Sequence, residues 1–393
     1  MSYEHDQRIV LTLDAGGTNF VFAAIAANQE IVSPITLPSN GHDLSTCLET
    51  IIAGFKQVKA QLRRSPVAIS IAFPGPADYP LGIIDDLINL PCFRGGIALG
   101  PMLERIFKIP VFLNNDGDLF VYGESMAGFL PAINGKLAAA GSPKRYKNLI
   151  GVTLGTGFGC GIATNGLLYL GDNSAGAEIW AIRNKIYPHS FAEEGASIRG
   201  VQKAYARQAY ARQAYAHQAY AHQTYAHQTY ARRTGLKYPS VPAPKEIYEI
   251  ARGNRPGDQA AALAAFREMG EIVGDALANT LTLLDGLIVI GGGLAGAAEL
   301  FLQTVVDELN GTLETYEGEK TKRTESKVFN LEDEIQLQTF LRGEVREITI
   351  PYTNEKIRYD PLKRVGVGLS RLGTSQAIAL GAYAFALKKL DQD

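Results

Sequence analysis

An aspartate and a glycine pair lie between two alternating apolar runs in residues 9–26. The period of two on both sides predicts a strand, a tight turn and a second strand. The glycine pair lets the backbone bend sharply and leaves N–H groups open to phosphate oxygens, while the aspartate can hold the Mg²⁺ that accompanies ATP. An ordinary hairpin tip is the alternative. The residues expected to contact a nucleotide here are Asp14, Gly16, Gly17, Thr18 and Asn19, with Asp14 as the magnesium ligand.

Two further glycine-rich segments repeat this chemistry. Residues 148–169 predict another strand, glycine turn and strand, and Asn165-Gly166 is typical of a hairpin turn. Residues 285–296 predict a buried strand that ends in three glycines and then a helix, where an adenine or a ribose could lie against the backbone. Because glycines also occur at barrels and bulges, the order of the three segments matters more than each one alone. The expected contacts are Gly155, Thr156, Gly157, Gly291, Gly292 and Gly293.

Asp116 is the candidate for acid–base chemistry. It follows a buried apolar strand and precedes an apolar helix, which we expect over residues 118–130. In phosphoryl transfer, positioning and charge neutralisation supply most of the rate. A carboxylate that accepts the proton of the attacking hydroxyl typically adds about 10²–10⁴-fold. The alternative role is that of a helix N-cap, which aspartate fills well.

The order of these segments resembles the ROK family (repressor, open reading frame, kinase) over most of the chain. Further similar segments are Phe73-Pro74-Gly75-Pro76, Asn89-Leu90-Pro91 and the strand that ends in Asn115-Asp116. The resemblance implies an α/β fold of the two-lobed actin-like (ribonuclease H-like) ATPase type, with the active site in the cleft between the lobes. It also implies ATP-dependent phosphorylation of a hexose or N-acetylhexosamine hydroxyl, with ATP and Mg²⁺ at the glycine turns and Asp116 as the catalytic base.

The sugar-binding residues that the resemblance implies are Gly75, Asn89, Asn115, Asp116, Glu178 and Glu193. Most family members carry Gly-Glu-Ile-Gly-His, in which the Glu binds sugar hydroxyls and the His contacts both sugar and zinc. Here the segment reads Ala-Glu-Ile-Trp-Ala, so Glu178 is kept and Ala181 replaces the His. Glu193 matches the family's Glu four residues before a Ser, although Glu194 is a rival.

The family's cysteine-rich zinc loop is also missing. Residues 183–192 stand in its place and contain no cysteine, and His189 is the only imidazole nearby. A structural zinc site needs about four nitrogen or sulfur ligands. We therefore expect no zinc site, and the loss leaves one end of the sugar subsite undefined.

The length of 393 residues indicates two lobes, because single cores seldom exceed about 250–300 residues. We expect a small lobe over 1–118, to which a helix at 375–390 returns, and a large lobe over 119–374. Two insertions fall in the large lobe, at 203–233 and 315–372, and the second could be a flap beside the substrate. Other expected elements are helices at 44–62, 260–284 and 299–313 and a strand at 67–73.

The insertion at 203–233 repeats a tyrosine every five residues. A step of five advances about 140° around a helix, so the tyrosines form no single stripe. We interpret the segment as a helix extended outward by repeat expansion, exposed to solvent. The alternative is an interaction or nucleic-acid arm, because it carries arginines and no acids and its tyrosines could stack on bases.

Composition sets the remaining expectations. The net charge of −2 argues against a nucleic-acid-binding surface, and the three cysteines are scattered. The chain shows no apolar run of the roughly 18 residues that a membrane span needs, and we expect no signal segment and no DNA-binding domain before the first strand. We expect a cytoplasmic homo-oligomer, a dimer by resemblance. A non-catalytic or regulatory sugar-binding relative and an interaction scaffold are the alternatives, and the sugar stays open among glucose, mannose, fructose, allose and N-acetylhexosamines.

Overall fold

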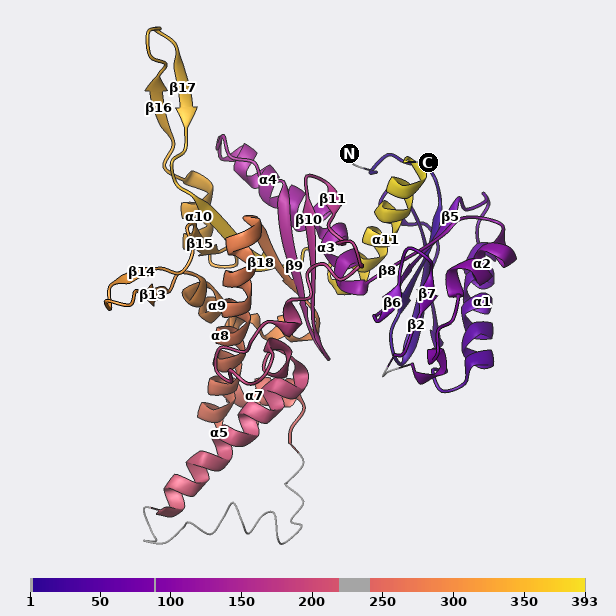
Figure 1. Ribbon diagram of the computed structural model, residues 1–393, viewed down its shortest axis with the longest axis horizontal. Coiled ribbons are helices and arrows are strands. Elements are labelled where there is room, and N and C mark those ends of the chain that lie inside the picture. The colour runs from indigo at the N-terminus through magenta and orange to yellow at the C-terminus, as the bar shows by residue number, and fades with distance from the viewer. Residues whose placement is uncertain (1–2, 88–89, 219–240, 393) are drawn as a thin grey trace.

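A computed structural model of the chain describes residues 3–87, 90–218 and 241–392, with the side chains of residues 213–218 left out. Two six-stranded sheets form the centres of two lobes, which Figure 1 shows side by side. Two of the expectations lie outside the described residues: the sugar contact at Asn89 and the later part of the tyrosine repeat.

The helices and strands have the following bounds. The α-helices are α1 (Leu44–Ala60), α2 (Leu99–Phe107), α3 (Asp116–Met126), α4 (Phe129–Ala139), α5 (Ile198–Gln218), α7 (Pro244–Ala251), α8 (Gln259–Leu284), α9 (Leu302–Leu309), α10 (Glu334–Arg342) and α11 (Thr374–Leu390). The short 3₁₀ helices are η1 (Pro91–Phe93), η2 (Ile179–Ala181), η3 (Ala192–Glu194) and η4 (Gly293–Leu300). The small-lobe strands are β1 (Val10–Ala15), β2 (Asn19–Ala26), β3 (Gln29–Glu30), β4 (Ile35–Pro38), β5 (Ala68–Ala72) and β8 (Val111–Asn114), and β6 (Ala77–Asp78) pairs with β7 (Ile83–Ile84). The remaining strands are β9 (Asn148–Leu154), β10 (Phe158–Thr164), β11 (Leu167–Leu168), β12 (Leu287–Gly291), β13 (Thr312–Glu314), β14 (Lys320–Lys322), β15 (Lys327–Asn330), β16 (Arg346–Thr349), β17 (Lys356–Tyr359) and β18 (Arg364–Leu369).

The small-lobe sheet brings the carboxyl ends of three strands to one edge. Its order is β3-β2-β1-β5-β8, and β4 also pairs with β2. β1 is antiparallel to β2 and parallel to β5, which is parallel to β8. Leu11 and Leu13 lie on one face of β1 and share a core with α1. Val10 lies on the opposite face and shares a core with α11. The alternation along β1 thus buries both faces of the sheet.

The large-lobe sheet has the order β11-β10-β9-β12-β18-β15. β12 runs parallel to both β9 and β18, so the turns that follow β9, β12 and β18 lie at one edge. Ile150 and Val152 share a core with α8 and α9, and Leu149 shares one with α3 and α10. Helices therefore cover both faces, as is usual for a sheet with parallel strands.

Helices α3 and α11 cross where the lobes join. A Cβ on Gly123 would overlap the carbonyl oxygen of Ala377, and one on Gly381 would overlap that of Leu119. The two helix backbones therefore lie in direct contact, and only glycine fits at both positions. α11 also packs against β1 and β5, and therefore links the end of the chain to the small-lobe sheet.

Several sequence-based boundaries were wrong. The helix expected at 118–130 begins at Asp116, ends at Met126 and is followed by a separate helix, α4. The buried Glu124 carboxylate accepts the Phe129 N–H at 2.6 Å, and α4 begins at Phe129. The helix expected at 299–313 is shorter: α9 covers Leu302–Leu309, and β13 follows. Both expectations followed apolar periodicity, which continues across the interruptions.

The segment 315–372 is not a single insertion. It supplies β15 and β18 to the large-lobe sheet and α10 beside them, whereas β16 pairs with β17 in a hairpin outside this sheet and β14 pairs with β13, which precedes the segment. Figure 1 shows β16–β17 projecting from the large lobe on the side away from the small lobe. That position does not suit the flap beside the substrate that the sequence suggested.

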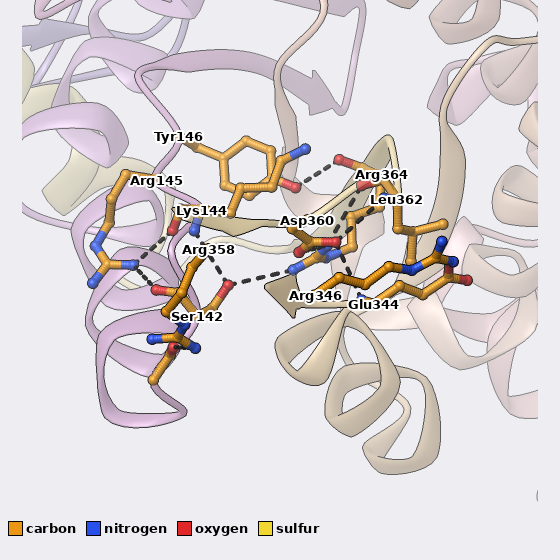
Figure 2. Close-up of polar contacts among 11 residues, drawn as sticks. Ser142, Lys144, Arg145, Tyr146, Glu344, Arg346, Arg358, Asp360, Leu362 and Arg364 are labelled. Atoms are coloured by element: carbon orange, nitrogen blue, oxygen red, sulfur yellow. Dashed lines mark hydrogen bonds and ion pairs between the residues drawn. The ribbon is translucent and has the colours of Figure 1, made fainter. Parts of the chain in front are cut away.

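A buried ion pair fixes the base of the β16–β17 hairpin (Figure 2). The Arg364 guanidinium, whose side chain is fully buried, pairs with Asp360 and lies over the Phe340 ring, 5.5 Å from its centroid. The Tyr146 hydroxyl donates to the Arg364 carbonyl oxygen at 2.6 Å, and Ser142 Oγ lies 3.4 Å from the guanidinium. A charge this deeply buried needs such partners.

The first part of the tyrosine repeat is not exposed throughout. α5 packs along α8, and Tyr205 is buried with its hydroxyl accepting the Asp258 N–H at 3.4 Å. Tyr210 is exposed. The helix is therefore confirmed up to Gln218, but its first turns belong to the large-lobe core. None of the described helices offers an apolar stretch that would span a bilayer.

Candidate active site

Asp14 lies near the carboxyl end of β1, one residue before the strand ends at the glycine turn that the sequence singled out. The strand–turn–strand prediction is confirmed: β1 and β2 pair from Val10↔Ile25 to Ala15↔Phe20, and residues 16–19 are exposed. The Ser39 hydroxyl donates to the Gly17 carbonyl oxygen at 2.7 Å and holds the turn. Burial raises the pKa of Asp14 to about 6, and the nearby charge of Asp116 contributes.

Sheet register explains why Asp14 and Asp116 lie close together. Asp14 pairs with Ala72 on β5, and Ala72 pairs with Asn114 on β8. The carboxyl ends of three adjacent parallel strands thus lie side by side, and Asp116 follows two residues after the last of them. In open α/β sheets, this edge is where ligands bind.

Asp116 occupies the first turn of α3, and the cap is its neighbour. Asn115 Oδ1 accepts the Gly117 N–H at 2.8 Å, so Asn115 is the N-cap and the capping alternative for Asp116 was wrong. The Asp116 carboxylate also accepts this N–H, at 2.9 Å, and it retains solvent-accessible surface. Desolvation by the surrounding protein raises the pKa of Asp116. A reachable carboxylate of raised pKa is a better proton acceptor.

Tyr79 is a site residue that the sequence did not indicate. Its buried hydroxyl donates to the Phe73 carbonyl oxygen at 2.8 Å and accepts from Asn115 Nδ2 at 3.3 Å. Burial raises its pKa, as do the charges of Asp116 and nearby carboxylates. Gly75 is exposed, and a Cβ there would lie 3.4 Å from the Tyr79 hydroxyl. Tyr79 therefore ties the Pro-Gly turn to the cap of α3.

The second glycine turn joins β9 to β10, as predicted. Gly155 N–H donates to the Gly157 carbonyl oxygen at 3.0 Å, and the Ile198 N–H donates to the Gly155 carbonyl oxygen at 2.8 Å. Thr156, between the two glycines, is exposed. The first turn of α5 is thereby held by a backbone hydrogen bond to the glycine turn between β9 and β10.

Glu193 contacts this turn rather than standing free. Its Oε2 accepts the Phe158 N–H at 3.0 Å, and its Oε1 pairs with Arg199 at 2.9 Å. Its rival Glu194 pairs with Arg199 and Lys203, and these cations lower its pKa. Both carboxylates therefore have partners within the large lobe.

The third glycine turn follows β12 and leads into η4. Gly292 has a φ of +86°, and a Cβ there would overlap the backbone of Leu154, so a side chain does not fit. Its N–H donates to Thr374 Oγ1 at 2.9 Å. Thr374 begins α11 and was missed by sequence reasoning, because it lies 82 residues from Gly292 in the chain.

Glu178 lies in the large lobe, yet its charge acts on the small-lobe residues. It raises the pKa of Tyr79 and, after burial itself, that of Asp118. Asp118 is 6 % exposed, and its Oδ1 has no hydrogen-bond partner in the described part of the chain. The Glu178 carboxylate accepts the indole N–H of Trp180. The structure thus brings Glu178 into electrostatic range of the Asp116 region.

The chain's own residues suit a nucleotide that carries Mg²⁺. A Cβ built on Gly155 or Gly293 would meet no atom within 4 Å, so both backbones border open space. Asp14 provides a carboxylate oxygen, the ligand type that Mg²⁺ prefers, and Mg²⁺ often takes only one or two carboxylates together with phosphates. Within the described ranges, residues 183–192 included, no group of three or more His, Cys, Asp and Glu side chains could hold a metal ion.

The fold and these turns define a two-lobed, actin-like ATPase architecture, and the comparisons with known proteins identify the group. The ROK family model matches residues 10–183. A glucokinase from Parabacteroides distasonis of solved structure is 50% identical, covers 99% of both chains and has a TM-score of 0.82. The chain belongs to the ROK family, which confirms the resemblance seen in the sequence.

Two further comparisons agree with this assignment. A glucokinase from Halalkalibacterium halodurans is 25% identical over 302 residues, which are 75% of this chain and 82% of that protein. The fold also matches a ROK glucokinase from Streptomyces griseus, solved with glucose and AMPPNP, at 19% identity and a TM-score of 0.58 over 95% of this chain and 97% of that one.

Proposed function

We propose that the chain is an ATP-dependent hexose kinase, similar to the glucokinases it matches. The observation that carries the proposal is the pair Asp14 and Asp116, electrostatically coupled at the carboxyl edge of the small-lobe sheet. The similarity to the Parabacteroides distasonis glucokinase over 99% of both chains supports the same reaction. The glycine turns at the corresponding edge of the large-lobe sheet supply the backbone that a nucleotide needs.

In this mechanism Asp116 acts on the sugar hydroxyl. Its carboxylate accepts the hydroxyl proton as the oxygen forms a bond to the γ-phosphorus, while the bond from that phosphorus to the bridging oxygen of ADP breaks. Asn115 holds the start of α3 through its bond to Gly117, so the direction of the Asp116 side chain is fixed. ATP with Mg²⁺ supplies the phosphoryl group and much of the charge neutralisation when bound.

Asp14 and the three turns form the nucleotide subsite in this proposal. Asp14 would hold Mg²⁺, the turn after β1 and the turn after β9 would face phosphates, and the turn after β12 would face the adenosine. The expected contacts are Gly16, Gly17, Thr18, Asn19, Gly155, Thr156, Gly157, Gly291, Gly292 and Gly293. Thr374 orients the last turn through Gly292.

The sugar subsite lies beside Asp116 in this proposal and uses Gly75, Asn89, Asn115, Glu178 and Glu193. Glu178 fits this role best because its charge reaches Asp118 and Tyr79. Glu193 would act from beside the second glycine turn. We further propose lobes of 1–118 and 119–374, joined by α3 and by α11 returning to the small lobe, and a cytoplasmic homodimer.

The test is a coupled assay of ADP release over a panel of hexoses and N-acetylhexosamines with ATP and Mg²⁺. We expect sugar-dependent release with at least one hexose. Release that is independent of sugar would indicate an ATPase. Sugar binding with no release would favour the regulatory relative, which the replacement of the family His by Ala181 makes the second candidate.

A further inference from the structure

Trp180 stands where the family resemblance expects a glycine, directly before Ala181 in the place of the histidine. It is the single tryptophan of the chain. The residue is 39% exposed, although large aromatic side chains are usually buried in cores or interfaces. An exposed tryptophan next to a proposed sugar ligand therefore needs an explanation.

Two contacts hold the Trp180 ring. Its Nε1–H donates to Glu178 Oε2, and its ring meets Phe191 edge-on, with centroids 5.7 Å apart and planes at 87°. Phe191 is itself anchored, because Arg183 and Phe191 form a β-bridge across the loop. The indole is thus a donor with a fixed direction.

Glu178 has little other support. It lies on the exposed surface just before η2, and its backbone carbonyl accepts the Ala181 N–H at 3.2 Å. Among the described residues, Trp180 is the hydrogen-bond donor to the Glu178 carboxylate, and no Lys, Arg or His of the described ranges forms an ion pair with it. A free glutamate side chain can lose up to about 2 kcal/mol of rotamer entropy when it is ordered. A rigid indole donor reduces that loss on sugar binding, since Glu178 is already oriented.

We propose that Trp180 is a positioning residue of the sugar subsite: its indole N–H orients the Glu178 carboxylate toward the sugar hydroxyls. This inference rests on the proposed function. Glu178 keeps one oxygen for Trp180 and has the other free to accept from a hydroxyl. Trp180 thereby supplies rigidity at the end of the subsite where Ala181 replaces the family histidine.

The sole tryptophan also gives a direct readout. Adding a hexose without nucleotide should change the Trp180 emission in a saturable manner, because binding at Glu178 alters the surroundings of the indole. The half-saturation point should match the sugar KM. An emission that does not respond to a hexose that the enzyme phosphorylates would overturn the proposal. Absence of phosphorylation in the wild type would instead refute the proposed function.

The matched variants are Trp180→Phe and Tyr187→Phe. Trp180→Phe keeps a ring and removes the N–H, whereas Tyr187→Phe removes the hydrogen bond to Glu268 from another exposed aromatic residue of the same loop. We expect Trp180→Phe to raise the sugar KM about tenfold, the effect of losing one hydrogen bond to a charged group, with the ATP KM and kcat within about twofold. Tyr187→Phe should change none of these constants. The effects of Trp180→Phe and Glu178→Gln on the sugar KM should be non-additive in a double-mutant cycle.

Three results would contradict the proposal. The first is an unchanged sugar KM in a Trp180→Phe protein that melts like the wild type. The second is a lower sugar KM, which would mean that the indole sequesters Glu178 from the sugar. The third is full additivity with Glu178→Gln, which would place Trp180 in a separate role.

Discussion

Asp116 is positioned by backbone rather than by a partner side chain. Asn115 caps α3, so Asp116 projects from a rigid first turn while its carboxylate stays accessible. Asp116→Asn keeps the shape of the side chain and leaves the Asn115 cap intact. We expect kcat to fall by about 10²–10⁴-fold, since the amide cannot accept the hydroxyl proton, with the sugar KM little changed. Steady-state kinetics measure this, and turnover near the wild-type value in the variant would remove Asp116 from the chemistry.

The pKa of Asp14 makes a second prediction about pH. The value of about 6 lies above the ordinary 3.8, so the folded state binds the proton more tightly than the unfolded state does. The contribution of Asp14 to the free energy of unfolding therefore falls as pH rises from about 4 to about 6, and the loss of this contribution is complete above about 6. Asp14→Asn should unfold at higher urea concentration than the wild type at about pH 7.5 but not at about pH 4.

The measurement is urea unfolding without nucleotide or Mg²⁺, at both pH values. If Asp14→Asn were more stable than the wild type by the same amount at both pH values, ionisation of the Asp14 carboxyl would not be the cause of the difference. In the wild type, the ATP KM should also rise below about pH 6, because the neutral carboxyl binds Mg²⁺ poorly.

At the scale of helices and strands, part of the fold could be predicted from the sequence and part could not. The strand–turn–strand motifs were predictable, because alternation and glycine spacing are local and the pairing registers follow from them. Three site residues were not predictable, because each contacts a segment that is distant in the sequence: Thr374 contacts the turn after β12, Tyr79 contacts the cap of α3 and Ser39 contacts the turn after β1. The boundaries at Met126 and Leu309 also failed, because apolar periodicity does not reveal polar groups that end a helix through contacts elsewhere in the chain. Glu124 accepts the Phe129 N–H after α3, and Asn310 bonds to the Val328 backbone after α9.

The crossing of α3 and α11 gives a prediction at the scale of elements. Gly381→Ala forces a Cβ against the Leu119 carbonyl oxygen, which cannot move aside as a side chain could. We expect a loss of about 1–3 kcal/mol or more in the free energy of unfolding, as for other overpacked positions. Gly135→Ala, in α4, is the control: a Cβ there meets nothing within 4 Å, and the change should stabilise by about 0.5–1 kcal/mol. Thermal melting of both variants tests the crossing, and equal melting temperatures would argue against it.

At the scale of the whole molecule, the β16–β17 hairpin is separable from the catalytic account. All residues of both strands are exposed, and the Arg364–Asp360 pair lies at the hairpin's base rather than within it. Replacing residues 347–358 by Asn-Gly, a turn suited to a two-residue hairpin loop, should leave kcat and both KM values within about twofold, since the phosphate turns lie at a distant edge.

Size-exclusion chromatography of the same variant reports whether the hairpin also contributes to assembly. Retained turnover with a changed elution volume would assign the hairpin to contacts between copies. Loss of turnover in a folded variant of unchanged size would contradict its separation from the site.

The central claim is that this chain transfers the γ-phosphoryl group of ATP to a hexose, and the product tests it most directly. The chain is incubated with ATP, Mg²⁺ and each hexose, and phosphorus NMR follows the reaction. We predict a hexose phosphate monoester that grows in equal amounts with ADP, and that disappears with Asp116→Asn. Formation of ADP with inorganic phosphate alone, or no phosphate ester with any hexose of the panel, would contradict the claim.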